Sequence, residues 1–354
     1  MFTIDRNGES GLQSVGTSMM RTITGNPLKC CFLSLPELET YHKELRKYRF
    51  EKGKKLKLIR LREALYPVFV LCVALDRIFR KETIELIGKR KRVKKQVIYA
   101  CTHIGGDDCQ RNFEAIGRGC WWFIGDPGGL YREAAGLLLH LNGCIMLDTG
   151  DKVDRHIAYQ RAVELLKAGG SLMIYPEGAR NGTENLPVMG LFQGTARMAM
   201  ETGVDIIPIA IEQYGKRFVI NMGDEIPVKE YSDKFELTQS LRDALANLKW
   251  DIWEREGVTL RSSLSSDHRE QFIREFEERI FPYDTLESVE RTRYRSEIPS
   301  PEEVFAHLEK IEVRKEPCQF SLTAAISSSS VKNSSSYTNC LITQSESMTL
   351  VIPM

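Results

Sequence analysis

The sequence lacks the short motifs that mark the commonest hydrolase, nucleotide-binding and protease sites. It contains no Gly-x-Ser-x-Gly segment, no phosphate loop ending in Gly-Lys-Ser or Gly-Lys-Thr, no Gly-x-Gly-x-x-Gly after a predicted strand and no His-Glu-x-x-His. These absences argue against a serine hydrolase, a nucleotide-binding protein and a zinc protease.

Cysteine and histidine are few and scattered. Nine cysteines and six histidines form no Cys-x-x-Cys pair and no spacing typical of a metal site, so neither a disulfide framework nor a bound metal is predicted, and a reducing compartment is expected. The first thirty residues include Asp5 and Glu9 and no sustained apolar core. No signal peptide is therefore expected.

Long apolar runs are also missing. The two longest, residues 64–75 and 134–147, are shorter than the roughly 20 residues that a spanning helix needs, so neither is predicted to cross a bilayer. The first lies between basic clusters, which is typical of an interfacial helix, with Leu65, Phe69 and Leu71 toward the bilayer. The second is predicted to be a buried helix that runs into a buried strand.

The charge is unevenly distributed although the formal net charge is only +1. Residues 43–95 hold nineteen Lys or Arg against six Asp or Glu, so the rest of the chain is acidic. Such a block can face anionic lipid or nucleic acid, or it can be a solvated helix face. The run GKRKRVKK (88–95) has no interleaved aromatic residue, which disfavours nucleic acid.

The order of apolar segments predicts an α/β fold. Helices are expected from residue 35 to residue 87, and again from residue 237, in residues 267–281 and from Pro301. Short apolar runs indicate strands at residues 96–102, 120–125, 143–148, 170–176, 205–212 and 217–223. Amphipathic segments between them (159–169 and 194–203) predict a mainly parallel sheet with helices on both faces.

This pattern divides the chain into five parts. Residues 1–34 are unassigned, and 35–95 are predicted to form a basic helical membrane-associating region. An α/β catalytic domain is expected at 96–260 and helices at 261–316. The Ser-, Thr- and Asn-rich residues 317–354 are predicted to be a disordered tail.

ACTHIGGDD (100–108) is the first candidate site. His103 follows a predicted strand, and ligands of open parallel sheets bind at that end. Two glycines give the chain room to bring the Asp108 carboxylate back to the imidazole, which would fix the tautomer and make His103 a general base. Alternatively, His103 packs at a strand end while Asp108 caps a helix.

IYPEGARNG (174–182) is the second candidate site. It also ends a predicted strand. Its Pro-Glu-Gly turn would present backbone amides, and Arg180 could bind an anion through two hydrogen-bond donors. The segment therefore indicates a phosphate or acyl-oxygen site. A surface turn with incidental charges is the alternative.

Residues 60–260 resemble the glycerolipid acyltransferase family, whose best-known members are 1-acylglycerol-3-phosphate acyltransferases. The resemblance rests on four blocks in this order: His103 with Asp108, then GCIMLDT, YPEGAR and IIPIAI. The resemblance implies that His103 deprotonates the acceptor hydroxyl, which attacks an acyl thioester, and that Asp108 orients His103. It implies no cofactor, because acyl carrier protein or coenzyme A brings the acyl group as a co-substrate. Glu177, Gly178 and Arg180 would contribute to the acceptor site, with Arg180 facing phosphate.

The sequence departs from the family pattern in three places. Thr102 stands where Asn is usual, and Ala179 stands where Thr is usual. Thr149 stands where the family commonly has an arginine that holds the acceptor phosphate, and Lys152 or Arg155 could substitute for it.

The sequence thus predicts an acyltransferase at the cytoplasmic face of the plasma membrane, peripheral or monotopic. Its acceptor would be a lysophospholipid, foremost 1-acylglycerol 3-phosphate, and its partners an acyl thioester and an anionic membrane surface, with no nucleic acid. The alternatives are transfer to a lyso-aminolipid or glycolipid and a non-catalytic lipid-binding relative.

Overall fold

The computed structural model describes residues 32–88, 93–132, 134–181, 186–257, 259–260, 265–268, 270–271, 274, 310–314 and 350–351. Its helices are α2 (Leu35–Glu51), α3 (Ile59–Ala64), α4 (Tyr66–Phe79), α5 (Asp108–Ile116), α6 (Ala134–Asn142), α7 (Lys152–Lys167), α8 (Gly194–Thr202) and α9 (Lys234–Glu256), with 3-10 turns η2 (Gly128–Tyr131) and η3 (Val228–Glu230). Its strands are β1 (Thr83–Ile87), β2 (Ile98–Cys101), β3 (Trp121–Gly125), β4 (Cys144–Leu147), β5 (Leu172–Ile174), β6 (Ile206–Tyr214), β7 (Arg217–Met222), β8 (Thr259–Leu260) and β9 (Leu350–Val351).

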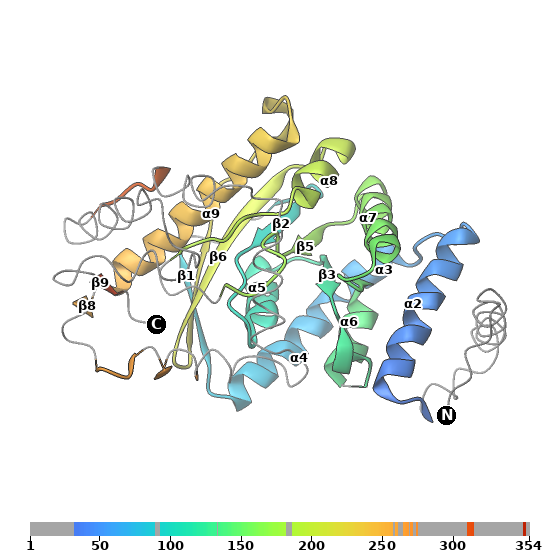
Figure 1. Ribbon diagram of the computed structural model, residues 1–354, viewed down its shortest axis with the longest axis horizontal. Helices are drawn as coiled ribbons and strands as arrows, with labels where there is room; N and C mark the ends of the chain where they lie inside the picture. The colour runs from blue at the N-terminus through green and yellow to red at the C-terminus, as the bar shows by residue number, and fades with distance from the viewer. Residues whose placement is uncertain are drawn as a thin grey trace, which may run out of the picture.

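A seven-stranded sheet forms the centre of the fold, in the order β1-β7-β6-β2-β5-β3-β4 (Figure 1). All neighbouring pairs are parallel except the β6–β7 hairpin. The six strands expected from apolar runs all form, so the prediction of a mainly parallel α/β sheet is confirmed. The carboxyl ends of β2 to β6 consequently meet at one edge, where a ligand site is expected.

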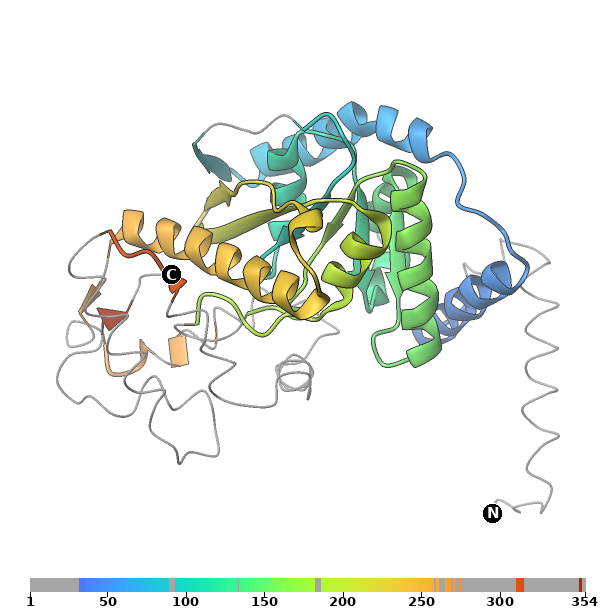
Figure 2. The ribbon, with the colours of Figure 1, turned by 90° about the horizontal axis from the view of Figure 1, so that it is seen from above.

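Helices cover both faces of the sheet. Alternating side chains of one strand point to opposite faces: Ile98 and Ala100 pack with α7, α8 and α9, whereas Tyr99 and Cys101 pack with α4 and α5. Figure 2 shows α9 and α4 on opposite sides of the sheet. Side-chain caps fix where two of the helices begin, since Asp151 and Asp233 accept the first amides of α7 and α9.

The N-terminal region differs in part from the expected run of helices. Helices α2, α3 and α4 form, but residues 83–87 form strand β1, which pairs with β7 at the edge of the sheet. An alternating sequence such as TIELI can become a strand when a partner edge is available, and that partner is supplied by distant sequence. The sheet therefore extends into the segment predicted to be a separate helical region.

Two predicted environments of apolar residues are corrected. Phe69, expected to face a bilayer, is buried against Phe113, with ring centroids 4.5 Å apart. The α6 helix, expected to be buried, leaves Leu137 and Leu141 exposed. Among the described helices, none is long and apolar enough to cross a membrane.

Several predictions concern residues outside those described. They include most of residues 1–34, the centre of the basic run (89–92), most of the predicted helices at 267–281 and from Pro301, and most of the tail. Within the tail, Leu350–Val351 pairs with Thr259–Leu260 in an antiparallel two-stranded sheet.

Candidate active site

His103 and Asp108 form the predicted pair. The His103 Nδ1 atom lies 2.7 Å from Asp108 Oδ2, and the imidazole ring lies 4.3 Å from the ring of Tyr175, centroid to centroid. One fifth of the His103 side chain is exposed, whereas the Asp108 side chain is fully buried. The carboxylate is therefore shielded from water, while the imidazole is accessible to a ligand.

The local chain path explains how the two side chains meet. Strand β2 ends at Cys101, and the following residues turn through Gly105 and Gly106, both with positive φ, before α5 begins at Asp108. Asp108 Oδ2 also accepts the amides of Ile104 and Gly105, at 2.8 and 3.0 Å. This turn binds the carboxylate of its own last residue.

These contacts decide the charge of Asp108. Burial opposes ionisation, but His103 and the two amides outweigh it and lower the pKa of Asp108 below its usual value. An ionised carboxylate only accepts hydrogen bonds, so His103 Nδ1 is the donor and Nε2 is left as the proton acceptor. The contact therefore defines which ring nitrogen of His103 points toward Asp108.

Thr102, which stands where the family usually has Asn, has a structural partner. Its side chain is buried, and its hydroxyl accepts the amide of Ile211 at 3.0 Å. This contact ties the end of β2 to β6 and leaves the dyad unchanged.

Glu177 lies behind His103 and supports its main chain. Its two carboxylate oxygens accept the amide of His103 at 3.2 Å and the amide of Met189 at 2.9 Å. Asn181, from the same turn, donates its main-chain N–H to the His103 carbonyl at 2.8 Å. Burial raises the pKa of Glu177, against the opposing effect of the two amides. The second candidate segment thus holds the first one in place.

Gly178 occupies a position that no larger residue fits. Its φ is +67°, and a Cβ atom there would lie 2.3 Å from the Phe192 ring. We expect Gly178→Ala to lower the free energy of unfolding by roughly 1–3 kcal/mol from backbone strain alone, measured by thermal unfolding. Gly194→Ala is the matched control, because a Cβ at Gly194 meets nothing within 4 Å. Equal stability of the two variants would contradict this view of the turn.

Arg180 lies near the dyad and is almost fully buried. Arg180 is close enough to α5 to act on Cys109 electrostatically. Burial raises the pKa of the Cys109 thiol well above its usual value, and the Arg180 guanidinium opposes that rise. The structure therefore brings His103, Asp108, Glu177 and Arg180 together at the ends of β2 and β5.

Thr149 and Lys152 lie elsewhere along the same edge. They follow β4, the outermost strand on one side of the sheet, and β4 is three strands away from β2. The amide of Thr149 donates to Asp126 at 2.9 Å, its hydroxyl contacts the same carboxylate, and Arg155 binds its carbonyl. Lys152 is exposed at the start of α7. The position of the usual arginine is thus occupied by a threonine bound to an acidic side chain.

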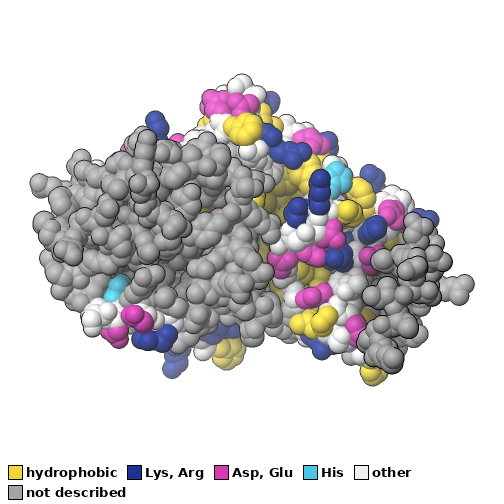
Figure 3. Space-filling model, in the orientation of Figure 1, with side chains coloured by type: hydrophobic (Ala, Val, Ile, Leu, Met, Phe, Trp, Pro, Cys, Tyr) yellow, Lys and Arg dark blue, Asp and Glu magenta, His cyan; other side chains and the backbone are white. Residues whose placement is uncertain are grey.

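Helix α2 supplies cations to this region that the sequence did not reveal. Lys43 lies 3.0 and 3.2 Å from the carboxylates of Asp148 and Asp151, and Arg46 Nε lies 2.9 Å from Asp154. Figure 3 accordingly shows side chains of both charges intermixed over the region of α7. Over a hundred residues separate these partners in sequence, and no local spacing signals the contact.

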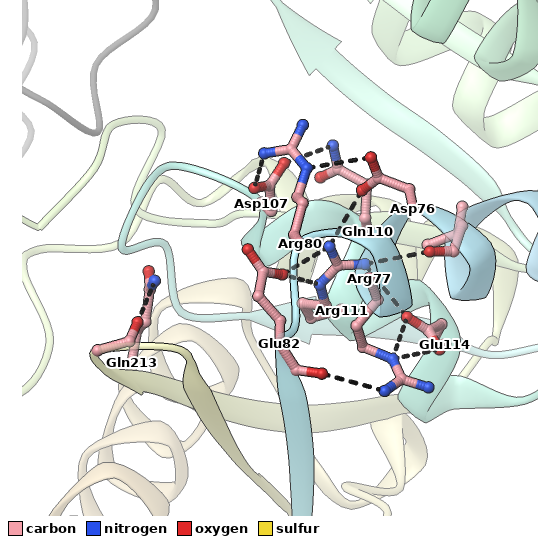
Figure 4. Close-up of polar contacts among 11 residues, drawn as sticks. Asp76, Arg77, Arg80, Glu82, Asp107, Gln110, Arg111, Glu114 and Gln213 are labelled. Carbon is pink, nitrogen blue, oxygen red and sulfur yellow. Dashed lines mark hydrogen bonds and ion pairs between the residues drawn. The ribbon is translucent and has the colours of Figure 1, made fainter.

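The dyad helix α5 is joined to α4 by seven charged side chains, which we call the α4–α5 ion network: Asp76, Arg77, Arg80, Glu82, Asp107, Arg111 and Glu114 (Figure 4). Arg111, fully buried, lies 2.7 Å from Glu82 and 3.2 Å from Asp76 and from Glu114. Arg80 lies 2.8 Å from Asp107, the neighbour of the catalytic candidate. The polar side of α4 is thereby fixed on α5.

Comparisons with known proteins find similarity in the α/β core. Residues 81–212 match the family model described as Acyltransferase, and this segment contains the dyad, Glu177 and Arg180. This match agrees with the family resemblance predicted from the sequence, over the segment that it covers. No curated protein matches the chain significantly. A solved structure, the 1-acyl-sn-glycerophosphate (LPA) acyltransferase PlsC from Thermotoga maritima, is similar at 15% identity with a TM-score of 0.46, over 59% of this chain and 86% of that chain.

Proposed function

We propose that this protein transfers a fatty acyl group from an acyl thioester to the hydroxyl of a lysophospholipid, with His103 as general base. The observation that carries the proposal is the 2.7 Å contact, after the carboxyl end of β2, between His103 and a fully buried Asp108 whose pKa is lowered by His103 and two backbone amides. The acyltransferase family match supplies the reaction class.

The reaction follows from the free Nε2 atom of His103. Nε2 takes the proton of the acceptor hydroxyl as its oxygen attacks the thioester carbonyl, and the carbonyl electrons move onto oxygen to give a tetrahedral intermediate. When the carbonyl re-forms, the carbon–sulfur bond breaks and the thiolate takes the proton from Nε2. Asp108 stabilises the imidazolium between the two steps. No acyl-enzyme is required, and the carrier is coenzyme A or acyl carrier protein.

Two acceptors are candidates. For 1-acylglycerol 3-phosphate, Arg180 would face the phosphate, since it follows the same turn as Glu177 and precedes Asn181, which binds the His103 carbonyl. A lyso-aminolipid or glycolipid is the second candidate, because Asp126 stands beside Thr149, where the family pattern places an arginine. A carboxylate there would repel a phosphate and attract an amine or a hydroxyl.

Helix α4 gives the lipid acceptor a route to this site. Its polar side is held by the α4–α5 ion network, and its outer side leaves large apolar residues exposed: Leu65, Val68, Leu71, Leu75, Ile78 and Phe79. In the sequence, basic residues of the 43–95 block precede and follow this row, which suits an anionic surface. The protein would thus sit peripherally on the cytoplasmic face of the plasma membrane.

Transfer of labelled acyl chains tests the function. Purified protein would receive acyl-coenzyme A or acyl carrier protein thioester together with vesicles holding lysophosphatidic acid, a lyso-aminolipid or a lysoglycolipid. A product with one acceptor identifies the substrate. Binding of every lysolipid without transfer from either thioester would favour the non-catalytic lipid-binding alternative.

Vesicle binding tests the α4 surface. We expect Leu71→Asp to weaken binding to anionic vesicles roughly 10- to 100-fold, the value of one buried leucine side chain, and salt to weaken wild-type binding by screening. Phe235→Asp is the control: Phe235 is 60% exposed and Leu71 59%, but Phe235 lies on α9, across the sheet from α4. Equal losses for both variants, or binding indifferent to salt and to anionic lipid, would contradict the proposed surface.

A further inference from the structure

Helix α9 carries two buried cations on the face that it turns toward the sheet. Arg242 and Lys249 are 4% and 3% exposed, and their spacing of seven positions places both on one side of the helix. Buried cations need partners, because an uncompensated charge in the interior is costly. Lys249 lies 2.7 Å from the buried Glu212 of β6. The partners of Arg242 lie in a loop next to the dyad.

Arg242 binds the loop that precedes α8. Its Nε atom donates to the Met189 carbonyl at 3.1 Å, and its Nη2 atom donates to the Val188 carbonyl at 3.4 Å. Val188 and Met189 are themselves buried. The planar guanidinium therefore spans two successive carbonyls, a geometry that a lysine ammonium does not reproduce.

The same loop residue connects Arg242 to the dyad. The Met189 amide donates to Glu177, whose other oxygen accepts the amide of His103. The Glu177 charge also favours the charged form of Arg242, while Lys249 and His103 favour the ionised form of Glu177. Two hydrogen-bonded residues thus separate the α9 guanidinium from the main chain of His103.

We infer that Arg242 is a positioning residue of the active site: through Met189 and Glu177 it sets the place of the His103 main chain and hence of the imidazole. The inference rests on the proposed role of His103. Arg242 lies beyond the segment that matches the acyltransferase family, which ends at residue 212. This chain therefore uses a helix outside that segment to hold the base.

Kinetics of Arg242→Met test this role. We expect kcat to fall on the order of 10- to 100-fold with little change in KM, because a displacement of about 1 Å at a catalytic group has effects of this size. The control is Arg217→Met. Arg217 also anchors α9, through an ion pair with Glu256 and a second contact to Glu85, and neither of these contacts involves the 188–189 loop.

The pH profile separates positioning from mere stability. Burial raises the pKa of Glu177, and the Lys249 and His103 charges oppose that rise. Because Glu177 and Arg242 also attract each other, loss of the Arg242 charge should raise the pKa of Glu177 further, so a protonated Glu177 should lower activity at higher pH than in the wild type. Arg242→Lys keeps the positive charge but loses the pair of hydrogen bonds to the Val188 and Met189 carbonyls. We expect it to restore the wild-type acid limb while kcat stays below that of the wild type.

Hydrogen–deuterium exchange gives a readout independent of any substrate. Arg242→Met and Arg242→Lys should speed exchange in peptides covering residues 102–108 and 186–192, and Arg217→Met should not. Normal exchange and a normal kcat in folded Arg242 variants, with His103→Ala inactive, would overturn the inference alone. An active His103→Ala would overturn the proposed function instead.

Discussion

Replacing His103 by alanine should lower turnover roughly 100- to 10,000-fold, the usual contribution of a general base. The acceptor hydroxyl would then have to lose its proton to water while it attacks the thioester. The fold should survive, since the side chain is partly exposed and its main chain stays bound to Glu177 and Asn181. Initial rates at saturating thioester and acceptor measure the effect, and circular dichroism checks the fold.

His156→Ala is the matched control for this experiment. His156 is an exposed histidine on α7, where its ring meets Phe50 edge to face with centroids 6.3 Å apart. Its removal should leave the rate close to that of the wild type. Wild-type turnover by His103→Ala, with the transfer reaction confirmed, would mean that another group or water removes the proton.

The part of the site that the sequence predicted is the part built from near neighbours. His103 and Asp108 are five residues apart, and two glycines between them adopt the positive φ that the turn needs. The six strands were also recognisable, because each is a short apolar run that contributes to the core. Local spacing and hydrophobicity contain this information.

The remaining features depend on distant partners. Strand β1 is a strand because β7, more than a hundred residues later, lies beside it. Glu177 was predicted to lie at the acceptor site, and that role stays a prediction. Its hydrogen bond to the main chain of His103 forms because β5 lies next to β2. Lys43 on α2 contacts the segment after β4, and Arg242 on α9 contacts the 188–189 loop. Side chains of this kind ordinarily belong to a solvated helix face.

Replacing Asp108 by asparagine should have the second large effect, a loss of about 100-fold or more in kcat. The side chain keeps its shape, and its amide oxygen can still accept from His103, Ile104 and Gly105, which all meet Asp108 at one oxygen. The negative charge that stabilises the imidazolium is lost. KM should change little, because Asp108 is fully buried and does not reach the substrate.

Asp107→Asn is the control for this substitution, since Asp107 precedes Asp108 but pairs with Arg80 in the α4–α5 ion network.

The pH dependence of the stability gives a second test. Because the pKa of Asp108 is lowered on folding, its ionisation stabilises the wild type above the unfolded value of about 3.9 and ceases to do so as pH falls through the folded value. The stability difference between wild type and Asp108→Asn should therefore be largest near neutral pH and shrink in acid. A constant difference would show that the substitution acts through packing, and the charge of Asp108 would then have no part in holding His103.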